Sequence, residues 1–72
     1  MDLLKTIGSN IRTRRKKAGF SQEELADSAG LHRTYVGGVE RGERNISVLN
    51  LAKLASVLKV KPHVLLSDRD EA

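Results

Sequence analysis

The 72-residue sequence contains no cysteine and very few aromatic residues. Without cysteine there are no disulfides or thiolate metal sites, so packing must stabilise a chain that is close to the lower size limit for a self-sufficient core. Phe20 and Tyr35 are the only aromatic residues, which argues against modules that stack RNA or single-stranded bases on aromatic rings. No apolar run approaches the length of a membrane span and no secretion signal is evident. We therefore expect a cytoplasmic protein with no membrane partner.

Positive charge is in excess and is unevenly distributed along the chain. The formal net charge is +4, although residues 68–72 carry three acidic side chains and one arginine. These five residues are predicted to form a short acidic tail, and residues 1–67 to form one domain that is more basic than the whole chain. A basic domain of this size suits a polyanionic partner whose phosphates it neutralises.

The segment Gln22–Arg41 predicts two short helices joined by a tight turn. Ser21 and Glu24 have the spacing of a capping box, and Gly30 suits the left-handed backbone that often ends a helix. The second helix, His32–Glu40, corresponds to the one that enters the DNA major groove in a helix-turn-helix. An ordinary hairpin of two helices in a small bundle is the alternative. The positions that agree with the helix-turn-helix pattern are Leu25, Ala26, Ala29, Gly30, Leu31, Val36 and Val39.

Three more helices complete a predicted all-α fold of five helices. The first spans residues 3–18 and carries one apolar stripe. Ser47 caps the fourth helix, and Pro62 at the first helical position starts a short fifth helix. Outside the motif, the residues predicted to face the core are Leu4, Ile7, Ile11, Phe20, Val48, Leu51, Leu54, Ala55, Leu58, Leu65 and Leu66.

The first turn of the second motif helix carries the candidate base contacts. The guanidinium of Arg33 suits a bidentate contact with guanine, and Thr34 either hydrogen-bonds a base edge or places its methyl group against thymine. Tyr35 is either a partly buried ring with its hydroxyl on a phosphate or a minor core residue. Gly37 and Gly38 are costly inside a helix. Their missing side chains either let the bases approach the backbone or allow close helix packing.

Polar and basic residues around the motif are candidate phosphate contacts. Gln22 and His32 each begin a helix, where free backbone N–H groups suit a phosphate oxygen. Arg44 and Asn45 follow the recognition helix in a loop that suits either phosphates or solvent. A run of cations ends the first helix, and their mutual repulsion favours a nearby anion. The candidates in that run are Arg15, Lys16 and Lys17.

Apolar residues late in the chain predict an interface. Val57, Val60, Val64 and the ring of Pro62 remain after the core is filled, and His63 lies among them; such a patch often marks a contact surface. A two-fold dimer would set its recognition helices one DNA turn apart, about 34 Å. No nucleophile motif, metal-ligand motif or pair of acids is evident. We therefore expect neither an enzyme nor a bound cofactor or metal.

The run SQEELADSAGLHRTYVGGVERGERN, residues 21–45, resembles the lambda-repressor-like helix-turn-helix family. Within it, LHRTYVGGVERGERN is similar to the controller proteins of restriction–modification systems, and the resemblance extends from Leu4 to Leu66. It implies a homodimer that binds a palindromic operator in double-stranded DNA and regulates its own gene and the linked endonuclease gene. Activation would occur at a high-affinity site and repression when a second dimer joins, with RNA polymerase as a further candidate partner.

The resemblance also implies roles for individual residues. It pairs Arg15 with Glu40, which would fix the recognition helix, and it places a dimer surface from Val60 to Val64. The chain departs from the family at Gly37 and Gly38, where a polar side chain often stands. A competing function on the same fold is that of an antitoxin or anti-repressor that acts by binding protein. The positions that match the family's DNA contacts are Gln22, Arg33, Thr34, Tyr35, Arg44 and Asn45.

Overall fold

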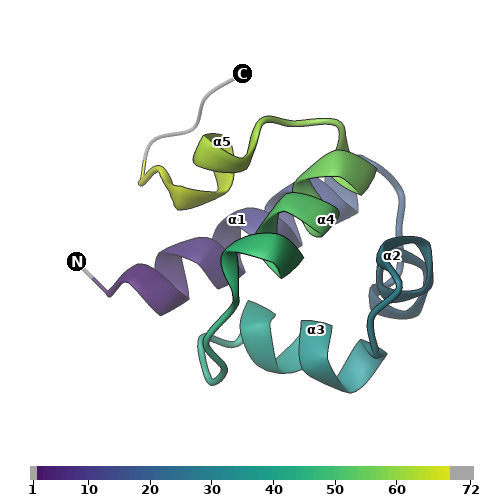
Figure 1. The fold of residues 1–72 in the computed structure, drawn as a ribbon, viewed down its shortest axis with the longest axis horizontal. Helices are drawn as coiled ribbons and strands as arrows, with labels where there is room; N and C mark the ends of the chain where they lie inside the picture. Colours follow the sequence, from purple (N-terminus) through teal and green to yellow (C-terminus); the bar gives the residue numbers. More distant parts are fainter. Residues whose placement is uncertain (1, 69–72) are drawn as a thin grey trace.

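Five helices joined by short turns make up residues 2–68, the part of the chain that the computed structural model describes. They are α1 (Leu3–Lys17), α2 (Gln22–Ala29), α3 (Arg33–Glu40), α4 (Val48–Leu58) and α5 (Pro62–Leu66). In Figure 1, α1 passes behind α4, α2 stands at one end of this pair, α3 lies beneath it and α5 lies above it. The predicted all-α fold of five helices is confirmed. Of the predicted acidic tail, all but Asp68 lies outside the described residues.

Side chains at the start of α2 and the glycine at its end set the bounds of this helix. The Ser21 hydroxyl accepts a hydrogen bond from the Glu24 N–H at 3.0 Å, and the Glu24 carboxylate accepts one from the Ser21 N–H at 2.8 Å. These contacts, the backbone donor above all, hold the pKa of Glu24 below its ordinary value. Gly30 ends α2 with a left-handed φ of 71°, as predicted. The Leu31 N–H then bonds the Ala26 carbonyl at 2.8 Å and turns the chain toward α3.

All five helices contribute to one apolar core. Partly buried Phe20, Ala29 and Leu31 pack against this core at the corner between α1, α2 and α3. Within residues 2–68, no helix combines the length and the apolar character needed to cross a bilayer. The buried members of the core are Ile7, Ile11, Leu25, Ala26, Val36, Val39, Leu51, Leu54, Ala55, Leu58 and Leu65.

The structure corrects two predictions about side-chain placement and one about where a helix begins. Val48 is 81% exposed rather than buried, because it is the first residue of α4 and projects beyond the edge of the core. Leu66 is 40% exposed, since its neighbour Leu65 takes the core position of the short helix α5. His32 lies before α3 as its N-cap residue, with extended backbone, rather than inside the helix.

Gly8 sets the separation between α1 and α3. A Cβ atom at this position would collide with the backbone carbonyl oxygens of Val39 and Glu40, at the end of α3. The backbone of α3 therefore lies directly on α1 with no side chain between them. This contact fixes the distance between α3 and α1.

Replacing Gly8 with alanine should destabilise the fold, because the added methyl group meets two backbone oxygens that cannot turn aside. Overpacking typically costs about 1–3 kcal/mol, and a clash with backbone atoms that cannot turn aside lies at the upper end of that range. It therefore outweighs the roughly 1 kcal/mol that alanine gains over glycine inside a helix. Urea unfolding followed by circular dichroism measures the change. Ser9→Ala, at the exposed neighbouring position of α1, is the control. An unchanged or higher midpoint for Gly8→Ala would contradict the close contact.

Candidate nucleic-acid interface

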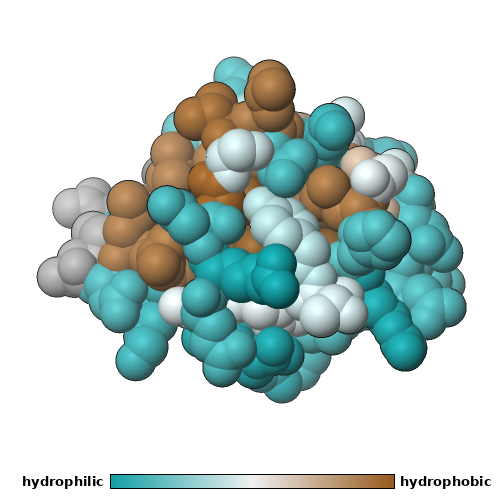
Figure 2. All heavy atoms as spheres, turned by 60° about the horizontal axis from the view of Figure 1, so that its bottom comes forward, coloured by the Kyte–Doolittle hydropathy of each residue, from teal (hydrophilic) through white to brown (hydrophobic). Residues whose placement is uncertain are grey.

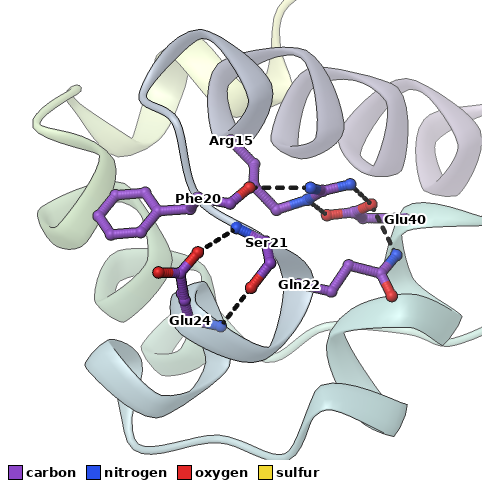
Figure 3. Close-up of polar contacts among 6 residues, drawn as sticks. All are labelled: Arg15, Phe20, Ser21, Gln22, Glu24 and Glu40. Carbon is purple, nitrogen blue, oxygen red and sulfur yellow. Dashed lines mark hydrogen bonds and ion pairs between the residues drawn. The ribbon is translucent and has the colours of Figure 1, made fainter.

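A buried ion pair holds α3 to α1 (Figure 3). Arg15 Nε donates to Glu40 Oε2 at 2.7 Å, and Arg15 Nη2 donates to Glu40 Oε1 at 3.0 Å. The Arg15 side chain is 10% exposed and that of Glu40 only 2%. Hydrogen bonding to Glu40 raises the pKa of Arg15 above its ordinary value, against the opposing effect of burial. The bidentate geometry compensates for the removal of both groups from water.

Two further hydrogen bonds extend this pair into the turn and into α2. Arg15 Nη1 donates to the Phe20 carbonyl at 3.0 Å, and Gln22 Nε2 donates to Glu40 Oε1 at 3.0 Å. Figure 3 shows the end of α1, the start of α2 and α3 meeting at this network. Arg15 was also expected to contact phosphate. That expectation does not fit this arrangement, because its guanidinium is buried and binds groups inside the protein.

The first turn of α3 is exposed to solvent at the opposite end of the helix from the ion pair. The Arg33 side chain is 72% exposed, and His32 and Thr34 are exposed beside it. Tyr35 is half-buried against the core, and its hydroxyl accepts a hydrogen bond from Asn50 Nδ2 at 3.1 Å. Figure 2 brings this underside of the molecule to the front. Hydrophilic side chains cover its lower and right parts, and hydrophobic ones gather toward its top and left.

Two shallow hollows adjoin on this surface and share Thr34. The first, about 300 Å³, is lined by side chains from α2, the start of α3 and its end. The second, about 460 Å³, is lined by the turn before α3, the start of α3, Arg44 and Asn50 of α4. The structure thus brings most of the predicted base and phosphate contacts onto one surface. The predicted contact residues that line the two hollows are Gln22, His32, Arg33, Thr34, Tyr35, Gly37 and Arg44.

Polar side chains of the same chain cover both glycines of α3. A Cβ on Gly37 would lie 3.2 Å from Arg41 Nη1 and 3.3 Å from Gln22 Oε1, and a Cβ on Gly38 would lie 2.9 Å from Arg44 Cγ. Neither open approach of a base nor helix-on-helix packing describes this arrangement. The glycines make room for two arginines and a glutamine. Arg41 was missed in the sequence, although a residue one turn beyond Gly37 shares its face of the helix.

The remaining predicted contact residues lie outside the two hollows. Lys16 and Lys17 are exposed on the last turn of α1. The Asn45 side chain accepts a hydrogen bond from the Ile46 N–H at 2.9 Å and so shapes its own loop. The predicted interface residues belong to α4, α5 and the turn between them. Of these, Val57, Val60 and Val64 are half-buried, whereas Pro62 and His63 are exposed.

Comparisons with known proteins cover nearly the whole chain. A family model described as helix-turn-helix matches residues 11–65. The control protein C.SmaI of Serratia marcescens is 43% identical over 67 residues, which are 93% of this chain and 80% of that protein. The crystal structure of the restriction–modification controller C.AhdI from Aeromonas hydrophila matches with a TM-score of 0.84 and 50% identity over 86% of this chain and 94% of that one. The regulator SinR, solved in complex with DNA, matches with a TM-score of 0.82 and 40% identity over 85% of this chain and 98% of that chain.

Removing one member of the buried pair should destabilise the fold strongly. Arg15→Met leaves the Glu40 carboxylate buried without its cation, which costs about 3–5 kcal/mol. The double variant Arg15→Met, Glu40→Leu leaves no unpaired charge and should recover more than half of that loss. Urea unfolding of the two variants and the unmodified chain measures both effects. A double variant less stable than Arg15→Met would show that the pair is not the source of the loss.

Proposed function

Because the chain belongs to the helix-turn-helix family of DNA-binding transcriptional regulators, we propose that it binds a palindromic operator as a homodimer and controls a restriction–modification system. In this proposal it activates transcription from a high-affinity site, through RNA polymerase, and represses when a second dimer occupies the adjacent site. It acts on duplex DNA in the cytoplasm and catalyses no reaction. The control protein C.SmaI and the controller C.AhdI, both similar over most of this chain, support the restriction–modification role.

One observation supports the proposal: the first turn of α3 is exposed and cationic, and the other end of this helix is anchored to α1. Arg33 and Thr34 face solvent at the start of α3, while the end of the same helix is held by Arg15 through Glu40. A side chain that contacts a base edge must be held at a defined depth in the DNA major groove. The scaffold supplies that depth and leaves the proposed reading groups exposed to solvent. SinR, which matches this fold, has been solved in complex with DNA.

We assign base contacts to the exposed face of α3 and phosphate contacts to its surroundings. Arg33 supplies a bidentate donor for guanine, and Thr34 and Tyr35 read the neighbouring step or its backbone. Gly37 and Gly38 contribute by admitting long side chains across the helix. The proposed phosphate contacts are Gln22, His32, Arg44, Asn45, Lys16 and Lys17.

The proposed dimer surface combines the start of α4 with the predicted interface residues Val57, Val60, Pro62, His63 and Val64. Val48 and Leu49 are 81% and 75% exposed, the two most exposed large apolar side chains among the described residues. Leu49 also lines an apolar groove of about 520 Å³ between α2 and α4, and Val57 lies at its other end. A second copy is the occupant that suits this surface, because a two-fold axis would set the protruding Leu49 of each copy into the groove of the other. Val57 joins this groove to Val60, Pro62, His63 and Val64.

Arg33→Ala should weaken binding to the operator and relax the base preference at one position in each half-site. A lost bidentate contact costs about 1–3 kcal/mol, roughly 5- to 150-fold in Kd. Selection from random duplexes identifies the operator, and fluorescence anisotropy then measures binding to operator and non-operator DNA. Arg44→Ala is the matched comparison. It should weaken both duplexes similarly and lower the salt slope by about one.

These measurements also test the proposal as a whole. Equal losses on operator and non-operator DNA for Arg33→Ala would contradict its role as a base reader. If the unmodified chain shows no salt-dependent binding to any duplex, the DNA-binding proposal fails and the protein-binding alternative, an antitoxin or anti-repressor, takes its place.

Leu49→Ser should weaken self-association about tenfold or more, as expected for a side chain that fills a pocket at the centre of an interface. Sedimentation equilibrium over a range of concentrations measures the dimer dissociation constant. Leu3→Ser is the control, because Leu3 is also an exposed apolar side chain at a helix start, 49% exposed, but lies on α1. The dimer surface would have to be placed elsewhere if both variants associate like the unmodified chain.

A further inference from the structure

The hydroxyl of Tyr35 on α3 is held by a side chain of α4. Asn50 Nδ2 donates a hydrogen bond to the Tyr35 hydroxyl oxygen at 3.1 Å. Asn50 lies in the first turn of α4, where its own N–H bonds the hydroxyl of the cap residue Ser47 at 3.1 Å. Both partners of the Tyr35–Asn50 contact are half-buried. The hydroxyl is therefore held by a residue whose position is set by a capped helix.

The direction of this hydrogen bond determines what the Tyr35 hydroxyl can do next. A phenolic hydroxyl both accepts hydrogen bonds and has one proton to donate, whereas the NH2 group of an amide only donates. Because Asn50 Nδ2 supplies the proton of the contact, the hydroxyl proton of Tyr35 is directed away from this nitrogen. Asn50 thus turns a hydroxyl that can rotate freely in water into a donor with a fixed direction.

The place of Tyr35 on α3 indicates the acceptor for this proton. The Arg33 side chain on the same helix is 72% exposed, whereas Tyr35 is half-buried and its hydroxyl meets α4. The hydroxyl therefore lies on the flank of α3 rather than on its most exposed face. Tyr35 and Asn50 line the same hollow as His32 and Arg44, which we assign to phosphates. Tyrosine hydroxyls are among the groups that bind phosphate oxygens in DNA complexes.

We propose that Asn50 is a positioning residue for DNA binding, which directs the hydroxyl proton of Tyr35 at a backbone phosphate. The inference rests on the proposed function and narrows the role of Tyr35 within it. Asn50 acts by fixing the orientation of the hydroxyl before DNA arrives, so that less freedom is lost on binding. Every base step carries a phosphate, so the contact adds affinity without a base preference.

Tyr35→Phe removes the hydroxyl and keeps the ring. Binding to operator and non-operator duplexes should weaken by a similar factor, about tenfold or more, as expected for a hydrogen bond to a charged group. The slope of log affinity against log salt should stay the same, because a neutral donor releases no counterion, whereas Arg44→Ala lowers that slope. Fluorescence anisotropy at several salt concentrations measures both quantities. A loss confined to the operator would place the hydroxyl on a base and overturn the phosphate assignment.

Asn50→Ala tests the positioning role. It should weaken binding to both duplexes roughly two- to fivefold, the scale of ordering one side chain. In the Tyr35→Phe background it should have no further effect, because the hydroxyl through which it acts is absent. Alanine is favoured inside a helix, so the variant should fold, which circular dichroism verifies. An equal loss with and without the hydroxyl would overturn the inference.

Nuclear magnetic resonance of the free protein tests the orientation without DNA. Tyr35 is the only tyrosine in the chain, so its ring signals are readily assigned. The side-chain amide protons of Asn50 should show nuclear Overhauser effects to the Tyr35 ring protons beside the hydroxyl. Without these effects, the amide would present its oxygen and take the hydroxyl proton itself, which overturns the inference. Failure of the proposed function is distinct, because the unmodified chain would then show no salt-dependent binding to any duplex.

Discussion

The structure depends on one pair of opposite charges kept away from water. Arg15 and Glu40 lie 25 residues apart in the sequence, and each would be costly to bury alone. Together they satisfy each other, and the remaining donor and acceptor capacity is taken up by the Phe20 carbonyl and the Gln22 amide. The end of α1, the turn that follows, the start of α2 and the end of α3 are thereby joined at one point. Apolar packing alone would hold these elements together without fixing their relative rotation so narrowly.

Small residues also constrain how α3 sits against the other helices, because they let backbones approach closely. Gly8 brings α1 against the last turn of α3 without an intervening side chain, and Ala26 of α2 is buried in the core. Gly37 and Gly38 act on the other side of α3, where they admit the side chains of Gln22, Arg41 and Arg44. One helix is thus held closely along its inner face, and its outer face is covered with long polar groups drawn from three separate segments. The inner face of α3 is therefore the rigid one, and the outer face is the adaptable one.

Most of the fold was predictable because its signals are local. The capping pair of Ser21 and Glu24, the turn at Gly30 and the apolar periods of α1, α2 and α4 each act within a few residues, and each is present in the structure. Val48 was misplaced because a periodic pattern does not show where the core ends beside a helix terminus. The side-chain partners at the candidate site were harder to predict. The contacts of Arg41 with Gly37 and Glu43, and of Arg44 with Gly38, depend on how the loop after α3 folds back, which spacing along the chain does not determine.

The contact at Gly8 limits how the proposed operator preference of such a protein can change during evolution. With α1 and α3 already touching through their backbones, the recognition helix cannot be tilted or raised without loss of the fold. With the base contacts proposed at positions 33 and 34, new sequence preferences are more accessible through exchange of these outward-facing residues, which contribute little to the core. The scaffold would stay unchanged while the exposed residues proposed to contact bases are exchanged.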